Sequence, residues 1–433
     1  MRRTRNQEVV RRGAIGIAVL AVSALMGLPY ANAEVSPKTS ASKRSATRVA
    51  PKKRSSVKTL AQNMTTSSTA AGQAQAQMSA QVETKSKTER KTKLKWKVST
   101  EGRQWENSNE RVQIAGFGAV FDFTHTINQN FLFKAVTGAT MRSGYVHTRF
   151  GEMRAGNSVW LAEGYLQGSV GSVLTLRGGV INQGIWDMTQ LNDGGAFPGL
   201  LQKIKFGDDY YVELMAGQSI PVAHDDLATR TTGAEPTPSF MVESLKIGLE
   251  PKDAWLTVSA FGGHWAYHDL PMRVAGESEV GGNTLIEVGE KTKQFKYRFE
   301  GWFVGANGQL NFTKRTNLGA YIRISQNTQV PEAYGASQVA GGSVTIGLPG
   351  NVDLRSGVDF FFAESDASPA YYNSTYYGHN NRDGYAVGLS ANFKDQGFRV
   401  GGLFTDANVI NPHPLQERQQ LYILKFETNY AAL

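Results

Sequence analysis

Hydrophobic and polar residues alternate along almost the whole chain from Trp96 onward, and the alternation breaks at glycine, asparagine and aspartate. Such a period of two places successive side chains on opposite faces of an extended strand, so it predicts β-structure. In SVLTLRGGVIN at 172–182, for example, Leu176 lies on an apolar face and Arg177 on the other. Sixteen strands are expected, at 94–104, 111–124, 130–142, 157–170, 172–182, 200–207, 209–219, 239–250, 254–264, 298–313, 316–327, 338–348, 352–363, 383–394, 398–406 and 419–431.

Short and long connections alternate strictly between these strands. The long ones are expected near 183–199, 220–238, 265–297 and 364–382. Antiparallel strands with short turns at one end and long loops at the other are typical of an outer-membrane barrel, with its short side in the periplasm. A soluble sandwich has no physical reason to sort its loops by length. The short turns are expected at 125–129, around Gly171, at 207–208, 251–253, 314–315, 349–351 and 395–397.

The apolar faces carry aliphatic residues in the middle of the strands and aromatic residues near the ends. Two aromatic belts around an aliphatic middle fit the two interfaces of a membrane. Within hydrocarbon an open sheet edge would leave backbone groups unpaired, so the sheet must close. The sequence therefore predicts an all-β protein, a transmembrane antiparallel up-and-down β-barrel of about 16 strands over 96–433. The aromatic residues expected to face lipid are Phe123, Phe131, Trp160, Phe206, Tyr210, Trp302, Phe312, Phe360, Phe393 and Phe398.

The first 33 residues have the features of an export signal. Five arginines precede an apolar run at 14–28, and Ala31-Asn32-Ala33 forms a small-residue cleavage site, so the mature chain is expected to begin near Glu34. The alternative is an uncleaved anchor, but the run is short and Pro29 breaks it. The chain has no cysteine, so disulfides and thiolate sites are excluded.

Residues 34–95 are expected to form a disordered, basic, low-complexity tail in the periplasm. They hold 14 basic and 3 acidic residues and almost no aromatic residue, so they cannot bury enough apolar surface to order. The formal charge of +9 thus describes the signal and the tail, and residues 96–433 are net negative. The tail could touch anionic lipid or acidic cell-wall polymers, or it could be a solvated linker.

With its export signal, sixteen strands and aromatic-rich final strand LYILKFETNYAAL, the chain resembles the bacterial outer-membrane porins, in style the phosphate-selective and other solute-specific ones. The resemblance covers about 96–433. It implies a multi-pass barrel in the outer membrane, both termini in the periplasm, contacts with membrane lipid and lipopolysaccharide, and a homotrimer as one arrangement. Porin chains usually end on an aromatic residue, whereas here Ala431, Ala432 and Leu433 follow Tyr430.

In such a barrel the polar strand face lines a water-filled lumen, which is the environment expected for Arg177. An excess of lysine and arginine on the wall favours anions. The alternative is that some of these side chains pair with wall carboxylates and only brace the barrel. The expected basic pore-lining residues are Lys134, Arg142, Arg177, Lys203, Lys205, Lys246, Arg323, Arg355, Arg399 and Lys425, and the acidic ones are Glu163, Glu213, Asp359 and Glu427.

In the porins that this chain resembles, the third outer loop folds inward and narrows the pore. The equivalent segment is INQGIWDMTQLNDGGAFPG, whose Gly-Gly and Phe-Pro-Gly permit sharp bends. If it folds in, Asp187 and Asp193 would face wall arginines such as Arg142 and Arg177 and form the constriction. The alternative is that the loop caps the outer rim.

No catalytic or metal-binding constellation is apparent, and no cofactor or nucleic acid is expected. The sequence shows no Gly-x-Ser-x-Gly elbow or phosphate-binding loop, and His264 and His268 fit a membrane interface better than a metal site. The predicted function is a porin for passive diffusion of small hydrophilic solutes, with a modest preference for anions. The alternatives are a surface receptor or adhesin that acts through its long loops, and a barrel enzyme, which the missing catalytic residues disfavour.

Overall fold

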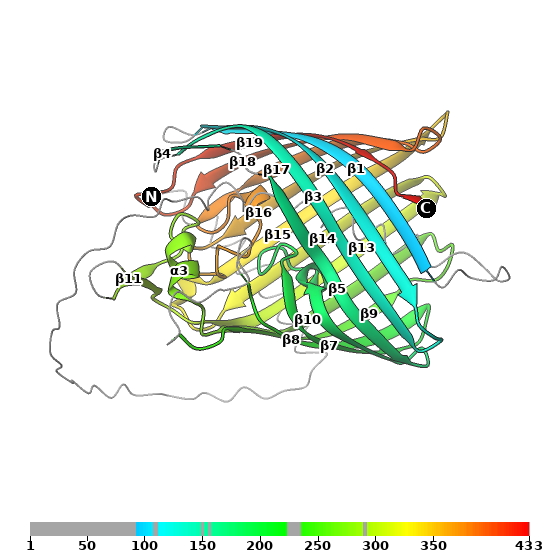
Figure 1. Ribbon diagram of the computed structural model, residues 1–433, viewed down its shortest axis with the longest axis horizontal. Coiled ribbons are helices and arrows are strands. Elements are labelled where there is room, and N and C mark those ends of the chain that lie inside the picture. The colour runs from blue at the N-terminus through cyan, green and yellow to red at the C-terminus, as the bar shows by residue number, and fades with distance from the viewer. Residues whose placement is uncertain are drawn as a thin grey trace. The chain divides into compact units, whose positions relative to one another are not determined.

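The computed structural model describes residues 92–106, 111–148, 151–154, 157–222, 235–288 and 292–432. The predicted export signal and almost all of the basic tail lie outside these residues. The described chain is a closed antiparallel barrel of sixteen strands, as the alternation predicted (Figure 1). The barrel strands are β1 (Thr92–Glu106), β2 (Arg111–Thr126), β3 (Phe131–Thr148), β5 (Ser158–Val170), β6 (Leu174–Asn182), β7 (Ala196–Phe206), β8 (Tyr210–Ser219), β9 (Ser239–Leu249), β10 (Leu256–His268), β13 (Phe299–Thr313), β14 (Thr316–Asn327), β15 (Ala336–Leu348), β16 (Val352–Ala363), β17 (Arg382–Phe393), β18 (Phe398–Val409) and β19 (Gln419–Thr428).

The barrel closes where β19 pairs with β1, in a register that places Lys425 opposite Glu101. Every barrel strand therefore has a partner on both sides, and no edge of the sheet is left open. The residues after Tyr430 add the two-residue strand β20 (Ala431–Ala432), which pairs with Lys95 and Trp96 of β1. The departure from an aromatic terminus is thus accommodated by a short extension of the sheet.

The loop lengths sort by end, as expected. Turns such as Gly350-Asn351, where both residues have a positive φ (72° and 53°), close one end, which we call the short-turn end. The other, the long-loop end, holds loops 183–195, 269–298 and 364–381. Three boundaries differ from the prediction by four or more residues, and one of them is the end of β3, which continues to Thr148. β10 continues to His268, and β7 already begins at Ala196, so the sequence Phe-Pro-Gly belongs to a strand and not to the loop.

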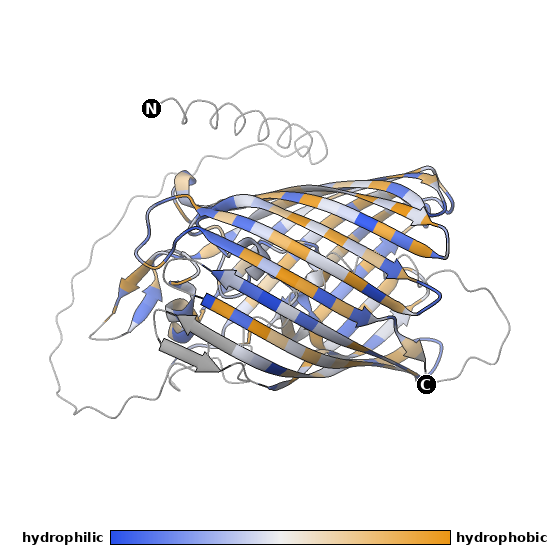
Figure 2. Ribbon diagram, turned by 90° about the horizontal axis from the view of Figure 1, so that it is seen from above, coloured by the Kyte–Doolittle hydropathy of each residue, from blue (hydrophilic) through white to orange (hydrophobic). Residues whose placement is uncertain are grey.

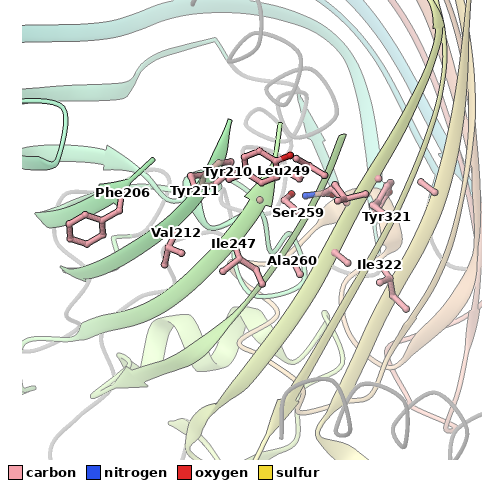
Figure 3. Close-up of a pocket in the computed structure, with 16 residues that line it drawn as sticks. Phe206, Tyr210, Tyr211, Val212, Ile247, Leu249, Ser259, Ala260, Tyr321 and Ile322 are labelled. Carbon is pink, nitrogen blue, oxygen red and sulfur yellow. The ribbon is translucent and has the colours of Figure 1, made fainter. Parts of the chain in front are cut away.

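Outward and inward faces alternate along each strand, as the hydropathy colouring in Figure 2 shows. On the outside, Leu200, Phe312 and Phe360 are each more than half exposed. In Figure 3, Tyr211 and Tyr321 extend from one side of the wall, and Val212 and Ile322 from the other. The period-two pattern thus separates an apolar outer surface from the lumen.

Several aromatic rings lie flat against the inner wall because the neighbouring strand has a glycine there. A Cβ atom added at Gly248 would lie 2.4 Å from the Tyr211 ring, and one added at Gly305 would lie 2.4 Å from the Phe261 ring. Glycine is therefore required at both positions because any side chain there would collide with the ring, and not because of the backbone conformation. Such aromatic cover of a strand glycine helps to fix the register of the sheet.

Trp160 is an exception to the predicted outer aromatic belt. The register between β3 and β5 shifts between Val136 and Thr137, and a β-bulge of this kind exchanges the faces of the residues beyond it. The indole of Trp160 consequently lies over Gly138 and donates to the hydroxyl of Thr140 (3.2 Å). The expectation that Trp160 faces lipid was wrong, because a simple alternation cannot reveal a bulge.

The long-loop end carries the remaining elements. One is β4 (Gly151–Arg154), which pairs with β3. The others belong to loop 269–298: the helix α3 (Met272–Ser278) and the hairpin of β11 (Leu285–Glu287) and β12 (Lys293–Phe295) (Figure 1). Three 3-10 turns complete the set: η1 (Gln183–Trp186), η2 (Glu332–Tyr334) and η3 (Thr375–Tyr377). Among the residues that the structure describes, no helix is both long and apolar enough to cross a membrane.

Candidate functional site

Loop 183–195 folds into the barrel rather than capping its rim. Its carboxylate at Asp187 forms an ion pair with Arg323, which lies halfway along β14, and the guanidinium also donates to the Asp187 carbonyl (2.9 Å). Asn307 of β13 contributes a further hydrogen bond to Arg323 (2.6 Å). The loop is therefore held against the wall in the middle of the barrel.

Arg323 is committed to this anchoring role. Besides Asp187 and Asn307 it donates to the backbone carbonyls of Ala306 (2.9 Å) and Ile322 (2.8 Å), and only 5% of its surface is exposed. Its guanidinium lies 5.0 Å from the ring centre of Phe261. With its donors satisfied and its surface covered, Arg323 has little capacity left to attract a passing solute.

Both predicted loop acids lie near wall arginines, as expected, but these are Arg323 and Arg103 and not the two named examples. Asp187 meets Arg323 instead of Arg142 or Arg177, although half of its side chain stays exposed. Asp193 is 9% exposed, and its backbone N–H donates to the carbonyl of Tyr372 in loop 364–381 (2.8 Å). The expected opposition of both acids to Arg142 and Arg177 was based on the inward fold alone, which does not fix the loop's rotation in the lumen.

Loops 183–195, 269–298 and 364–381 are joined by a buried polar network. Asn283 donates to the carbonyls of Ser365 (2.7 Å) and Ser368 (3.0 Å), and the Ser368 hydroxyl donates to the carbonyl of Gln190 (2.6 Å). Asp366 accepts from both the backbone and the hydroxyl of Thr284 (2.9 and 2.7 Å). Burial raises the pKa of Asp366, while these donors oppose that shift. Because buried polar groups are costly to separate, the three loops act as one unit, the loop plug.

An apolar cluster, the aromatic core, fixes the loop plug against one side of the wall. Tyr267 of β10 stacks on Tyr372 with parallel rings (5.5 Å between centroids) and on Phe240 (4.2 Å). Trp265, with no exposed surface, and Phe303 complete the wall side. All of its residues are less than a tenth exposed, and they come from β6, β7, β9, β10, β13 and the loops: Ile181, Trp186, Met188, Leu191, Phe197, Leu201, Phe240, Val242, Trp265, Tyr267, Val274, Phe299, Phe303, Tyr371 and Tyr372.

Five of the ten predicted basic wall residues form ion pairs. Lys134 binds Glu163 (2.7 Å) and Lys203 binds Glu213 (2.5 Å). Glu427 takes both Arg399 (2.5 Å) and Lys425 (3.0 Å), and the fifth is Arg323. These five residues thus fit the alternative stated above, in which part of the basic wall only braces the barrel.

The other five contact neutral groups, and four of them also lie near a wall carboxylate: Lys205 and Lys246 are opposite Glu213 in the register, and Arg355 and Arg142 are attracted by Asp359 and Glu101. Arg177, the residue in the opening stretch, donates to the side-chain carbonyl of Gln167 (2.8 Å) and lies 4.9 Å from the Tyr165 ring centre. Lys205 and Lys246 lie 4.3 and 5.7 Å from the ring centre of Tyr211.

Arg355 donates to the hydroxyl of Ser343 (3.4 Å). Arg142 has a buried Nη1 with no hydrogen-bond acceptor. Cations outnumber carboxylates among the wall residues named here, so the wall keeps a positive excess.

The remaining predicted acid, Asp359, is held by phenols. Tyr321 of β14 and Tyr377 of loop 364–381 donate to its two carboxylate oxygens (2.7 and 3.2 Å). The Tyr377 ring also stacks on Phe361 (4.7 Å). Asp359 therefore tethers the loop plug to β16, a role that its sequence position did not suggest.

Further charged residues that lie on the inner wall were missed from the sequence. Lys97 lies 3.5 Å from Glu427, and Arg103 pairs with Glu101 on the same strand. Asp353 binds Arg315 (3.1 Å) near the short-turn end. The alternation that places Trp96 and Val98 outside also places Lys97, Glu101 and Arg103 inside, so the inward register of β1 could have revealed them.

The histidines that the sequence singled out lie on the outer face of β10. His264 lies 3.4 Å from Glu300, an ion pair only when the ring is protonated, and directly opposite Glu243 in the register. No group of three or more histidine, aspartate or glutamate side chains suited to a metal ion occurs within the described ranges.

Comparisons with known proteins give matches in structure only. No family model and no curated protein matches the chain. The high-pH structure of OprB from Pseudomonas putida matches with a TM-score of 0.51 at 12% identity, over 78% of this chain and 94% of that one. In vitro folded OmpT of Vibrio cholerae in its trimer form gives 0.45 at 12% identity, over 79% and 100%. OmpF of Salmonella typhi in complex with daunomycin gives 0.44 at 9% identity, over 78% and 98%.

The likeness to OprB extends over nearly all of that chain. The sequence identity is too low for the role of any residue to be transferred from it. The likeness shows that the two chains share a fold. The relation to phosphate-selective porins in particular stays a prediction. The chain has the fold of the bacterial outer-membrane porins.

Proposed function

We propose that this protein is a water-filled channel of the outer membrane through which small hydrophilic solutes diffuse passively, with a modest preference for anions. The barrel would span the membrane many times, with its short turns and both termini in the periplasm. Its partners would be membrane lipid, lipopolysaccharide and the solutes, and a homotrimer is the expected assembly. The predicted export signal is consistent with this location.

The anion preference is supported by a difference in ion pairing between the acidic and the basic side chains of the wall. The acids Glu163, Glu213 and Glu427 each have a cationic partner within 3.0 Å. By contrast, Arg177 contacts neutral groups, the side-chain amide of Gln167 and the ring of Tyr165. Paired charges contribute little field at a distance, whereas uncompensated ones lower the energy of a counter-ion in a narrow lumen. The lumen therefore favours anions although the barrel as a whole is net negative.

The experiment is the reversal potential of the purified protein in a planar bilayer under a salt gradient. Replacing Arg177 and Arg355 together by glutamine removes two positive charges and should move the reversal potential toward that of a cation-selective pore. Arg177 contacts the neutral Gln167, so its loss should leave the wall ion pairs intact, and Asp359 keeps its two phenol donors when the nearby charge of Arg355 is lost.

Glu163→Gln is the matched control, because it frees Lys134 from its ion pair and adds one positive charge to the lumen. Its reversal potential should move the opposite way, toward anions. Identical potentials in wild type and both variants would remove the selectivity proposal. A barrel that inserts and never conducts would instead favour a surface receptor or adhesin.

A further inference from the structure

Four polar side chains lie on the outer face of the neighbouring strands β7, β8, β9 and β10, and we call them the outer polar patch: Gln202, Gln218, Glu243 and His264. Each is exposed, and next to each in the chain stands a buried residue of the inner wall, such as Val242 beside Glu243. Glu243 lies directly opposite His264 in the register of β9 and β10. The alternation therefore turns all four side chains away from the lumen.

The outer polar patch lies at the depth of the apolar band of a membrane. A strand tilted by about 45° rises about 2.3 Å per residue along the barrel axis, and the band is about 25 Å high. Gln202 is four residues from Phe206, and Gln218 is eight residues from Tyr210, two exposed aromatic residues at the short-turn end. The two amides therefore lie about 9 and 18 Å above that end, inside the band.

The side chains of this patch are poorly matched to lipid. Within the described part of the chain, those of Gln202, Gln218 and Glu243 take part in no hydrogen bond or ion pair, and His264 approaches Glu300 (3.4 Å). Polar and charged groups are costly in hydrocarbon because no water is present there to solvate them. A protein surface that supplies donors and acceptors is a better environment for this patch than acyl chains.

The same face of the barrel is hollowed beside the patch. An apolar groove of about 820 Å³ runs across β8, β9, β10, β13 and β14, with Phe206 at one end (Figure 3). Its lining includes the small residues Ala260, Ala306, Gly308 and Ala320, which leave it shallow in side chains. Within a membrane, small residues allow a second protein surface to approach closely, and polar side chains then bond across the contact.

Two copies of this face are complementary about a two-fold axis that runs along the membrane normal between β9 and β10. Because Glu243 and His264 are register partners, their depths differ by only about 3 Å. The rotation therefore groups two carboxylates with two imidazoles at the axis, so each Glu243 gains the partner's His264 as a donor. A two-fold contact of this kind joins identical patches.

The groove fits the same arrangement. Gln202 on β7 and Ala260 on β10 each lie four residues from the short-turn end of their strand, so they share a depth. They lie on opposite sides of the axis. In the pair, the surface around Gln202 of one copy therefore faces the groove of the other.

We infer that the outer face of β7 to β10 is a contact surface for a second copy of this barrel, in which both copies use the same face and Glu243 meets the partner's His264. The contact is separate from the homotrimer proposed above, since a ring of three joins two different faces of each copy. It requires a barrel that spans a membrane, and it does not depend on whether the barrel conducts.

The first test exchanges the charges at the axis and measures self-association of the refolded barrel by analytical ultracentrifugation in density-matched detergent. Glu243→His leaves only imidazoles at the axis, and His264→Glu leaves only carboxylates. Each variant alone should associate at least about 10-fold more weakly than the wild type, because like groups then face each other. A mixture of the two variants should recover the wild-type association, since every carboxylate again meets an imidazole.

The second test is disulfide cross-linking in lipid vesicles, with copper phenanthroline as catalyst and oxygen as the oxidant of the two thiols. The chain has no cysteine of its own, so each variant carries a single thiol. Leu245→Cys lies on the outer face of β9, two residues from Glu243, and should give a covalent dimer. Leu424→Cys is the matched control, because it makes the same exchange at an outward position, 66% exposed, on β19 across the barrel.

Three results would overturn the contact surface. They are a wild-type barrel that stays monomeric, a mixture that associates no better than its components, and equal cross-linking of the two cysteine variants. None of these measurements requires a current, so a barrel that pairs through this face and never conducts would refute the proposed channel and leave the contact standing.

Discussion

The two halves of the lumen are built from the same alternating strands but by opposite rules. One half places Trp265, Phe303 and Tyr267 inward, where they pack against loops as in the core of a soluble protein. The other places Ser390, Gly401 and Arg355 inward, and its inward aromatic residue Phe361 is covered by Tyr377 of loop 364–381. A barrel interior is thus not uniformly polar, and wherever inward residues are aromatic, a loop must cover them because exposed apolar surface in water is unfavourable.

The largest difference between the halves should appear in stability. Trp265→Ala removes a side chain with no exposed surface from the aromatic core and leaves a cavity, at a cost of about 3–5 kcal/mol in the free energy of unfolding. Arg355→Gln should cost less than about 1 kcal/mol, since it removes a long hydrogen bond (3.4 Å) and a partly exposed charge that attracts Asp359. Denaturant unfolding in lipid vesicles measures both. Similar costs for the two variants would mean that the halves do not differ in packing.

The next effect concerns the border between the halves. Arg323→Ala removes the anchor of loop 183–195 and leaves the carbonyls of Asp187 and Ala306 without their donor. Because half of the Asp187 side chain is exposed and screened, we expect a loss of about 2–3 kcal/mol, below that of a fully buried pair. Single-channel recording should show a larger and noisier conductance as the loop moves. Arg399→Ala, which breaks a wall pair away from the loop, should keep the current quiet.

The smallest expected effect is a pH dependence of the outer rim. Burial lowers the pKa of His413 below 6.5, against the opposing charges of Glu279 and Asp366, while Arg382 adds to the shift. The folded state therefore favours the neutral ring, whose Nδ1 accepts from the backbone N–H of Leu415 (3.3 Å).

For a lowered pKa, the stabilisation is complete above pH 6.5 and is lost as the pH falls through the folded-state value. Below about pH 6, protection of the Leu415 amide from hydrogen exchange should decrease by less than about 1 kcal/mol, the worth of one hydrogen bond. His413→Gln should abolish this pH dependence. Unchanged protection in the wild type from pH 7 to pH 5 would contradict the assignment.

The strands were predictable because their signal is local. Alternation along a strand decides which side chain faces lipid, and Gly350-Asn351 or Gly207 sets a turn within a few residues. Even the inward position of Arg177 follows from its neighbours Leu176 and Gly178. Where local order is interrupted, as by the bulge beside Val136, prediction failed for Trp160.

The sequence by itself determined the class of fold and the strand order, since these depend on residues a few positions apart. Only the tertiary structure decided which charged side chains form ion pairs with each other. Arg323 and Asp187 are separated by 136 residues, and Asp359 meets Tyr377 and Tyr321 from two directions. The fold of the long loops is set by packing and hydrogen bonds between distant segments, and no period along the chain records those contacts.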